Sequence, residues 1–425
     1  MGIGGSAEVA EVQGRALEVG AGRAGAVPRW VAASMPLLLR LLVLWLATRV
    51  VFVLLAYLGY KLHLFQPTGQ LGGGLILSWQ RWDVNWYLII SRLGYPTRQS
   101  ANFFPLFPAL MGGISWLLGD GGGPVFPQPD KLRVLVGMGI SNVALLVGLY
   151  AVARLAQLDA EPEDERAGVR AAWILLAYPF AVAWMAPYSE GLFLAFTALA
   201  LLFARRGRWY WVGLVGLLAG LTRPTAVILI LPIAWEYGRQ HGWWQRLPRP
   251  SGEFARQLAK GAVAIGSVPA GIGLYFAYLY IRFGDILLPL HTQLQYWHHV
   301  AMPPWSTLQL AVRNLRTIPD SGLLSTDLTL LAGVTLVVVA GIRRLPVAYL
   351  LYMAGLLYLV TAAPVTVIPD VLTGVTRYMD AAIPVFLVLS WWAARRPLLE
   401  MALVSGGMIL QGAMTIAFFQ GSPVA

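Results

Sequence analysis

The chain contains no cysteine and has few charged side chains for its length of 425 residues. The absence of cysteine excludes disulfides, thiolate metal sites and cysteine nucleophiles. Charged residues make up 12% of the chain, against about 25% in ordinary soluble domains. Hydrophobic residues make up 58% and the mean hydropathy is +0.65. This composition predicts an all-α polytopic membrane protein.

The formal net charge of +11 comes almost entirely from arginine, and these arginines lie at the ends of apolar segments. A nucleic-acid-binding protein would instead gather its basic residues in a stripe, so we do not expect nucleic acid as a partner. Short basic connections are typical of the cytosolic side of a membrane protein. Four such groups occur: Arg205, Arg206 and Arg208; Arg239, Arg246, Arg249, Arg256 and Lys260; Arg343 and Arg344; Arg395 and Arg396.

Apolar segments predict about eleven transmembrane helices, although several are shorter than the roughly 20 residues that a perpendicular span needs. They cover residues 37–60, 132–153, 171–187, 191–204, 209–221, 225–237, 261–280, 326–342, 346–363, 381–394 and 398–419. If the N-terminus is cytosolic, alternation of these spans places all four basic groups in the cytosol. The loops 61–131, 282–325 and 364–380 then face outside. Residues 1–30 are expected to be a disordered cytosolic tail without a cleavable signal peptide, and residues 31–425 a single membrane domain without internal repeats.

The first external loop contains an aromatic stretch, residues 79–108, that predicts two helices lying in the membrane interface. In the first, Trp79, Trp82 and Trp86 recur at helical spacing. Gly94 is expected to end this helix and Pro96 to prevent its resumption. The second is expected over residues 103–118. Asp83 would then lie beside the tryptophan stripe, at the edge of the water layer, where a carboxylate can act as a base.

Isolated polar residues fall at the external ends of the predicted spans, which indicates a common site. They are Asp83, Tyr188, Ser189, Glu190, Arg223, Asp285, Gln293, Arg377 and Tyr378. Asp83 is the candidate base for an acceptor hydroxyl. Arg223 and Arg377 are the candidates for binding a phosphate leaving group. This pattern suits transfer of a sugar, with inversion, from a lipid phosphate.

Each of these residues also has a structural alternative. Asp83 could cap its helix or pair with a neighbouring arginine, and Glu190 could cap the helix after Pro187. Arg223 and Arg377 could reach lipid headgroups. Arg49 lies within the first span and needs a partner, either the donor phosphate or a structural ion pair. His291, His298 and His299 are expected to be solvated loop residues, because the last two point to opposite sides and do not favour a metal site.

Six motifs occur in order between residues 82 and 386: WDVNWYLIISRLGY, ANFFPLFPAL, AYPFAVAWMAPYSEGLF, RRGRWYWVGLVGLLAGLTRPTAV, FGDILLPLHTQLQYW and TRYMDAAIPVF. Together they resemble the PIG-V family of membrane mannosyltransferases in the GT-C superfamily. The resemblance implies a polyprenyl- or dolichyl-phosphate sugar donor, no cofactor, and an essential aspartate matching Asp83. Substrate contacts are expected from Tyr188, Glu190, Asp285, Gln293 and Tyr378, which match motifs of the family, and also from Trp82 and Asn85. Val84 and Asn85 after Asp83, and Asn102 before the Phe-Phe-Pro, depart from the usual family pattern.

The sequence thus predicts a glycosyltransferase, a mannosyltransferase by resemblance, that acts on the non-cytosolic membrane face. No Asp-X-Asp pair lies on the cytosolic side, which argues against a nucleotide-sugar donor. The acceptor, a lipid or a glycan, is not identified. The alternative is a transporter or flippase of lipid-linked sugars, which would need similar phosphate contacts but also repeated halves with broken helices. The preference for arginine over lysine suggests a bacterial plasma membrane.

Overall fold

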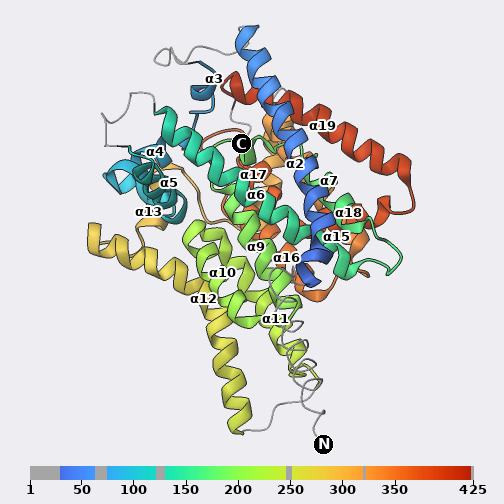
Figure 1. Ribbon diagram of the computed structural model, residues 1–425. Helices are drawn as coiled ribbons and strands as arrows, with labels where there is room; N and C mark the ends of the chain where they lie inside the picture. The colour runs from blue at the N-terminus through green and yellow to red at the C-terminus, as the bar shows by residue number, and fades with distance from the viewer. Residues whose placement is uncertain (1–28, 63–73, 121–129, 246–250, 319–321, 423–425) are drawn as a thin grey trace, which may run out of the picture. The chain divides into compact units, whose positions relative to one another are not determined.

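A computed structural model describes residues 29–62, 74–120, 130–245, 251–318 and 322–422, drawn as ribbon in Figure 1. Within these ranges the regular structure is helical, and the sole β-type pairing is a bridge between His299 and Val365. The α-helices are α2 (Arg29–Lys61), α3 (Gly74–Leu77), α4 (Asp83–Leu93), α5 (Leu106–Leu117), α6 (Lys131–Asp159), α7 (Ala167–Leu176), α8 (Val182–Met185), α9 (Glu190–Arg205), α10 (Trp209–Thr222), α11 (Ile230–Gln240), α12 (Gly252–Phe283), α13 (Leu288–Tyr296), α14 (Pro304–Thr317), α15 (Gly322–Gly341), α16 (Val347–Thr361), α17 (Val375–Tyr378), α18 (Ile383–Ala393) and α19 (Pro397–Phe419). Three 3-10 helices, η1 (Arg98–Asn102), η2 (Pro224–Leu229) and η3 (Met379–Ala381), complete the order.

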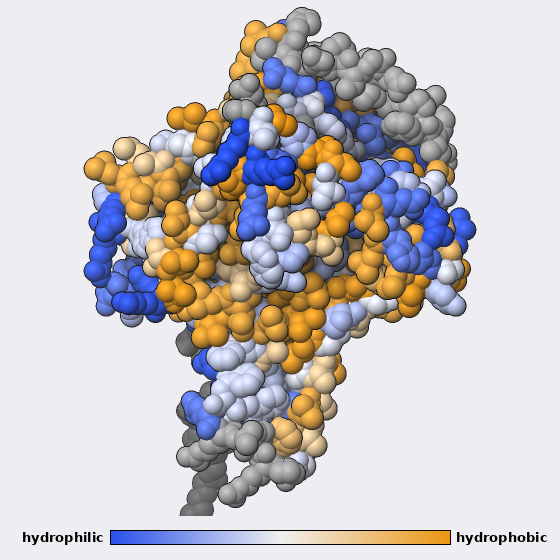
Figure 2. Space-filling view, turned by 180° about the vertical axis from the view of Figure 1, so that it is seen from behind, coloured by the Kyte–Doolittle hydropathy of each residue, from blue (hydrophilic) through white to orange (hydrophobic). Residues whose placement is uncertain are grey.

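Five helical segments in the described ranges are long and apolar enough to cross a membrane. They are Met35–Gly59, Lys131–Asp159, Gly252–Phe283, Leu324–Gly341 and Pro397–Phe419. Large apolar side chains on these segments remain exposed, including Leu54, Val263, Ile281, Leu336 and Ile409. Apolar residues also cover much of the face shown in Figure 2. The predicted class, an all-α membrane protein, is therefore confirmed, whereas the number of crossings stays a prediction.

The segment 171–187, expected to be one span, is divided in the structure. Helix α7 ends at Leu176 and a separate short helix, α8, begins at Val182. Pro179 lies between them and has no N–H for a helical hydrogen bond, which explains the break. Residues 225–237 are likewise shared between η2 and α11. Of the expected tail, residues 1–28 lie outside the described residues, and residues 29 and 30 begin α2.

Glycines bring the helices of the described bundle into close contact. Helices α9, α10 and α12 lie side by side, and α6 packs along α9 (Figure 1). A Cβ added to Gly191 in α9 would lie 2.5 Å from the carbonyl oxygen of Ser141 in α6. A Cβ on Gly271 in α12 would likewise overlap the carbonyl oxygen of Leu217 in α10. Small residues thus fix how these helices lie against one another.

The expected interfacial helix starts four residues later than its apolar pattern predicted. Helix α4 begins at Asp83, after Trp82 at φ 52°, and ends at Gly94 with φ 68°. Trp79 lies outside the helix and is buried, with its ring centroid 4.8 Å from that of Phe419 in α19. The prediction of a continuous tryptophan stripe on this helix was therefore wrong, because Trp79 lies outside α4 and packs against α19. The expected end of α4 at Gly94 is confirmed.

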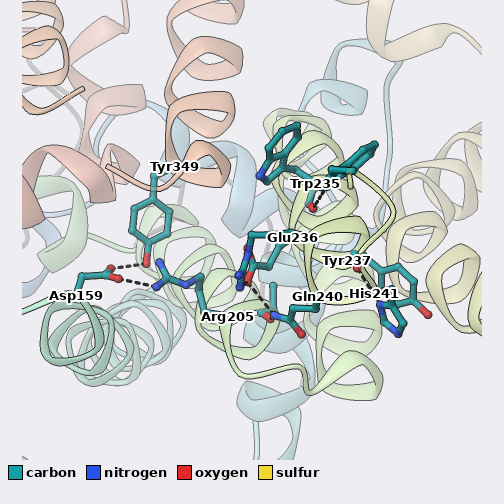
Figure 3. A network of polar contacts seen from close by, with 11 residues as sticks. Asp159, Arg205, Trp235, Glu236, Tyr237, Gln240, His241 and Tyr349 are labelled. Atoms are coloured by element: carbon teal, nitrogen blue, oxygen red, sulfur yellow. Dashed lines mark hydrogen bonds and ion pairs between the residues drawn. The ribbon is translucent and has the colours of Figure 1, made fainter. Parts of the chain in front are cut away.

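A polar cluster joins the ends of four helices (Figure 3). Asp159 at the end of α6 accepts hydrogen bonds from Arg205 of α9 at 2.7 Å and from Tyr349 of α16 at 3.0 Å. Glu236 of α11, 2% exposed, accepts from Gln240 at 2.8 Å, and Gln240 also donates to the backbone of Ala204. Helix α9 therefore begins at Glu190 and ends in this cluster, a rise of about 24 Å at 1.5 Å per residue.

Candidate functional site

Four charged residues from distant parts of the chain form one continuous ionic network. Glu190 is 1% exposed, and its Oε1 forms an ion pair with Arg223 Nη1 at 2.6 Å and accepts a hydrogen bond from Arg377 Nε at 2.7 Å. Arg377 Nη1 also donates to Asp83 Oδ2 at 2.5 Å. The expected meeting of Asp83, Arg223 and Arg377 is confirmed as geometry. The network alternates in sign and its two negative and two positive charges cancel.

Close backbone packing positions Glu190. The hydroxyl of Ser141 in α6 donates to the carbonyl of Tyr188 at 2.6 Å, just before α9 begins. A Cβ on Gly137 would lie 2.6 Å from Cβ of Pro187, so only glycine leaves room for this turn. Glu190 is the first residue of α9, where the helix dipole favours a carboxylate. The turn before α9 is thus clamped against α6 and holds the carboxylate in place.

The two arginines are held where helices end. Arg223 follows the last residue of α10, and Pro224 prevents the helix from continuing. Its guanidinium lies over the ring of Tyr378, 5.5 Å from the centroid. Arg377 is carried by α17, a single turn that starts after Gly374 at φ 90°, a backbone angle suited to glycine. Its guanidinium lies 5.0 Å from the ring centroid of Tyr188.

The network borders a pocket of about 180 Å³. Asp83, Arg223 and Arg377 supply its charged lining, and the side chain of Asp83 is 25% exposed. The other lining residues are aromatic or polar, together with one proline and one glycine: Tyr87, Asn102, Phe103, Phe104, Ser189, Thr222, Pro224, Thr225, Gln293, Trp297, His299, Thr373, Gly374 and Tyr378. A carboxylate that water can reach thus stands beside two guanidinium groups.

Two side chains of the pocket lining carry a polar atom that is buried without a hydrogen-bond partner among the described residues. They are Thr225, at Oγ1, and Asn102, at Nδ2. Arg223 forms an ion pair with Glu190 through Nη1, and no hydrogen bond from its guanidinium to another residue is seen in the described part of the chain. Buried polar groups usually find partners, because an unpaired group costs about 1–3 kcal/mol. The pocket is therefore suited to a ligand that carries an anionic group and additional oxygens.

Two lining residues, Trp297 and His299, were not expected from the sequence, which placed the histidines in solvent. Residues 298–302 run beside residues 362–365: Val300 N donates to Pro364 O at 3.1 Å and Met302 N to Ala362 O at 2.9 Å. His299 Nδ1 bonds the carbonyl of Ala363 at 2.7 Å, so this nitrogen carries the hydrogen. Burial lowers the pKa of His299, so the ring is neutral at pH 7 and Nε2 is an acceptor. No local sequence pattern signals this pairing.

The expected residues divide between the pocket and other places. Asp83, Arg223, Gln293, Arg377 and Tyr378 line the pocket, and Glu190 and Tyr188 lie buried behind it. The structure does not bring Trp82 or Asn85 into the pocket. Trp82 is 44% exposed, and Asn85 accepts a hydrogen bond from Gln80.

Asp285 and Arg49 also lie away from the pocket lining. Asp285 pairs with Arg98 at 2.5 Å and with His291 at 2.9 Å, and these contacts, the hydrogen bond from His291 first, lower the pKa of Asp285. Arg49 is buried, bonds Asn142 Oδ1 at 2.8 Å and lies over the ring of Phe52. No carboxylate pairs with Arg49 in the described part of the chain, so the structural ion pair expected for Arg49 is not seen there.

The described fold and site define an all-helical membrane protein with a charged pocket at helix ends. Among the described residues no group of three histidine, aspartate or glutamate side chains is placed to hold a metal ion. No protein-family model matches the chain, and no curated protein matches it.

Proposed function

We propose that this protein is an inverting glycosyltransferase that moves a sugar from a polyprenyl phosphate to an acceptor hydroxyl. The ionic network of Asp83, Arg377, Glu190 and Arg223 at a single pocket is the observation that carries the proposal. The six motifs make the PIG-V family and mannose our choice of family and sugar. We further propose the GT-C arrangement with about eleven crossings and a pocket that opens to the non-cytosolic face.

The proposed step uses the two kinds of charge separately. The carboxylate of Asp83 takes the proton of the acceptor hydroxyl as the acceptor oxygen bonds to the anomeric carbon. The bond between that carbon and the phosphate oxygen breaks, and its electron pair leaves with the lipid phosphate. Arg223 and Arg377 stabilise the charge that develops on this phosphate. A phosphate is a weak base, so the step needs no general acid.

The contact between Arg377 and Asp83 predicts the order in which the donor binds and the acceptor is activated. Arg377 holds Asp83 at 2.5 Å and can exchange that carboxylate for a donor phosphate. Exchange would free Asp83 at the moment when the donor is in place. Donor binding is thus expected to precede acceptor activation, and a steady-state analysis should show an ordered mechanism with the donor first.

The test supplies purified protein with polyprenyl-phosphate-mannose and a panel of glycoside acceptors, and measures both lipid phosphate released and glycoside formed. Asp83→Asn removes the base and should lower the rate by about 10²–10⁴, while Asp83→Glu should retain part of it. Glu163→Gln, an exposed carboxylate change, is the matched control. A carrier of lipid-linked sugars would release no lipid phosphate. Equal rates for Asp83→Asn and the parent would reject Asp83 as the base.

A further inference from the structure

Asn102 lines the pocket, and one end of its carboxamide has no hydrogen-bond partner among the described residues. It is the last residue of η1 and lines the pocket. The hydroxyl of Thr292, a buried residue of α13, donates to Asn102 Oδ1 at 2.8 Å. Asn102 Nδ2 is buried and has no hydrogen-bond partner. The side chain is therefore fixed at one end and has unused hydrogen-bonding capacity at the other.

One end of the Asn102 carboxamide stays without a partner in either orientation of the carboxamide, because Thr292 can pair with the oxygen or with the nitrogen. The Thr292 hydroxyl lies 2.9 Å from the carbonyl of Leu288, one helical turn earlier, and can donate there. Its oxygen would then accept from Asn102, and the carbonyl end of the carboxamide would be the end without a partner. A ligand hydroxyl both donates and accepts, so it can satisfy whichever end is free.

An aromatic wall stands next to this amide. Trp297 and Gln293 line the same pocket and lie, like Thr292, on α13 or directly after it. The ring of Trp297 is fixed by Phe103, with centroids 6.0 Å apart, and by Trp86 at 6.4 Å. A rigid aromatic ring offers an apolar face, and the nearby amides offer hydrogen bonds without charge. A sugar ring has this same combination of apolar C–H faces and hydroxyl edges.

The charged and uncharged parts of the pocket suit different parts of one substrate. Arg223 and Arg377 suit a phosphate, whereas Asn102 and Gln293 carry no charge to offset one. We propose that Asn102, with Gln293 and Trp297, forms a subsite that binds a pyranose ring and reads one of its hydroxyls. This subsite rests on the proposed function and adds a specificity-determining residue to it. The ring belongs either to the donor or to the acceptor.

The experiment measures two quantities for Asn102→Ala, Asn102→Asp and the parent. The first is the affinity for polyprenyl-phosphate-mannose relative to bare polyprenyl phosphate, and the second is KM for a glycoside acceptor. If the subsite binds the donor sugar, the affinity for polyprenyl-phosphate-mannose relative to bare polyprenyl phosphate should fall about tenfold in the variants. If it binds the acceptor, KM for the glycoside acceptor should rise about tenfold. Both changes are those expected for the loss of one hydrogen bond. Gln309→Ala, an exposed carboxamide on α14, is the control. An unchanged affinity for bare polyprenyl phosphate shows that the variants are folded.

Deoxy sugars identify the hydroxyl that is read. The parent should bind one monodeoxy analogue about tenfold more weakly than the intact sugar, and Asn102→Ala should bind the two equally, since the contact is already lost. If the parent transfers sugar and neither variant changes the affinity ratio or KM, this subsite is wrong and the proposed function stands. If the parent neither transfers sugar nor changes its tryptophan fluorescence with methyl glycosides, both proposals fail.

Discussion

Glu190 explains why two arginines can share a pocket. The guanidinium groups of Arg223 and Arg377 would repel each other, and Glu190 Oε1 forms ion pairs with both. With 1% exposure and no place in the pocket lining, Glu190 does not reach a substrate. The sequence left open whether this residue binds substrate or caps α9. The structure places it at the first position of α9 and as the shared counter-ion of the arginines.

Glu190→Gln should destabilise the protein by about 3–5 kcal/mol, since it leaves two largely buried guanidinium groups, Arg223 and Arg377, with one remaining counter-ion. Denaturant unfolding in detergent measures the loss. Glu163→Gln changes an exposed carboxylate and should stay within about 0.5 kcal/mol of the parent. Added inorganic phosphate should raise the melting temperature of Glu190→Gln more than that of the parent, because the anion replaces the missing charge. A Glu190→Gln protein as stable as the parent would contradict this role.

At the scale of elements, close helix contacts determine where Arg223 points. Helix α10 carries Arg223 at its end and packs on α12 through Gly220 and Gly271. Because backbone touches backbone there, added bulk on α12 is expected to displace α10. The position of Arg223 therefore depends on glycines that lie outside the pocket.

Two glycines of α12 provide a matched pair of variants. Gly271→Ala places a methyl against the carbonyl of Leu217 and should cost about 1–3 kcal/mol by overpacking. Gly273→Ala meets nothing within 4 Å and should be neutral or stabilising by up to about 1 kcal/mol, since alanine favours helix. Only Gly271→Ala should also weaken binding of polyprenyl phosphate. Unfolding and lipid-binding measurements on both variants test this, and equal effects would show that the contact does not position Arg223.

The elements also show what the sequence could and could not predict. Hydropathy and the helical spacing of apolar residues identified the apolar helices. The end of α4 at Gly94 followed from the glycine and proline residues alone. The meeting of Asp83 with Arg377 followed from assigning their segments to one side of a membrane. The start of α4 depends on the tertiary packing of Trp79. The break between α7 and α8 depends on Pro179, which lies within an apolar run. Trp297 and His299 reach the pocket through pairing of residues 298–302 with 362–365, a contact that hydropathy does not encode.

At the scale of the whole molecule, the two ends of α9 lie in different surroundings, the pocket at one end and a short basic connection at the other. Glu190 and the pocket lie at its start, and Arg205 with the cluster of Figure 3 at its end. The short basic connections that indicate a cytosolic location include Arg205, Arg206 and Arg208. If these face the cytosol and α9 crosses the membrane as predicted, the start of α9 and the pocket face outside.

Because the natural chain has no cysteine, single cysteines can report this orientation without background. Gln309→Cys is exposed on α14, in the loop expected outside, and Glu165→Cys is exposed between α6 and α7, in the loop expected inside. On intact cells a membrane-impermeant maleimide should label Gln309→Cys and leave Glu165→Cys unlabelled until the membrane is permeabilised. The reverse pattern would put the pocket in the cytosol, where a donor in the outer leaflet cannot reach Arg223, and the proposed reaction would then require a cytosolic donor. Labelling of both sites before permeabilisation would instead contradict the predicted alternation of spans, because an odd number of crossings separates these two loops in that topology.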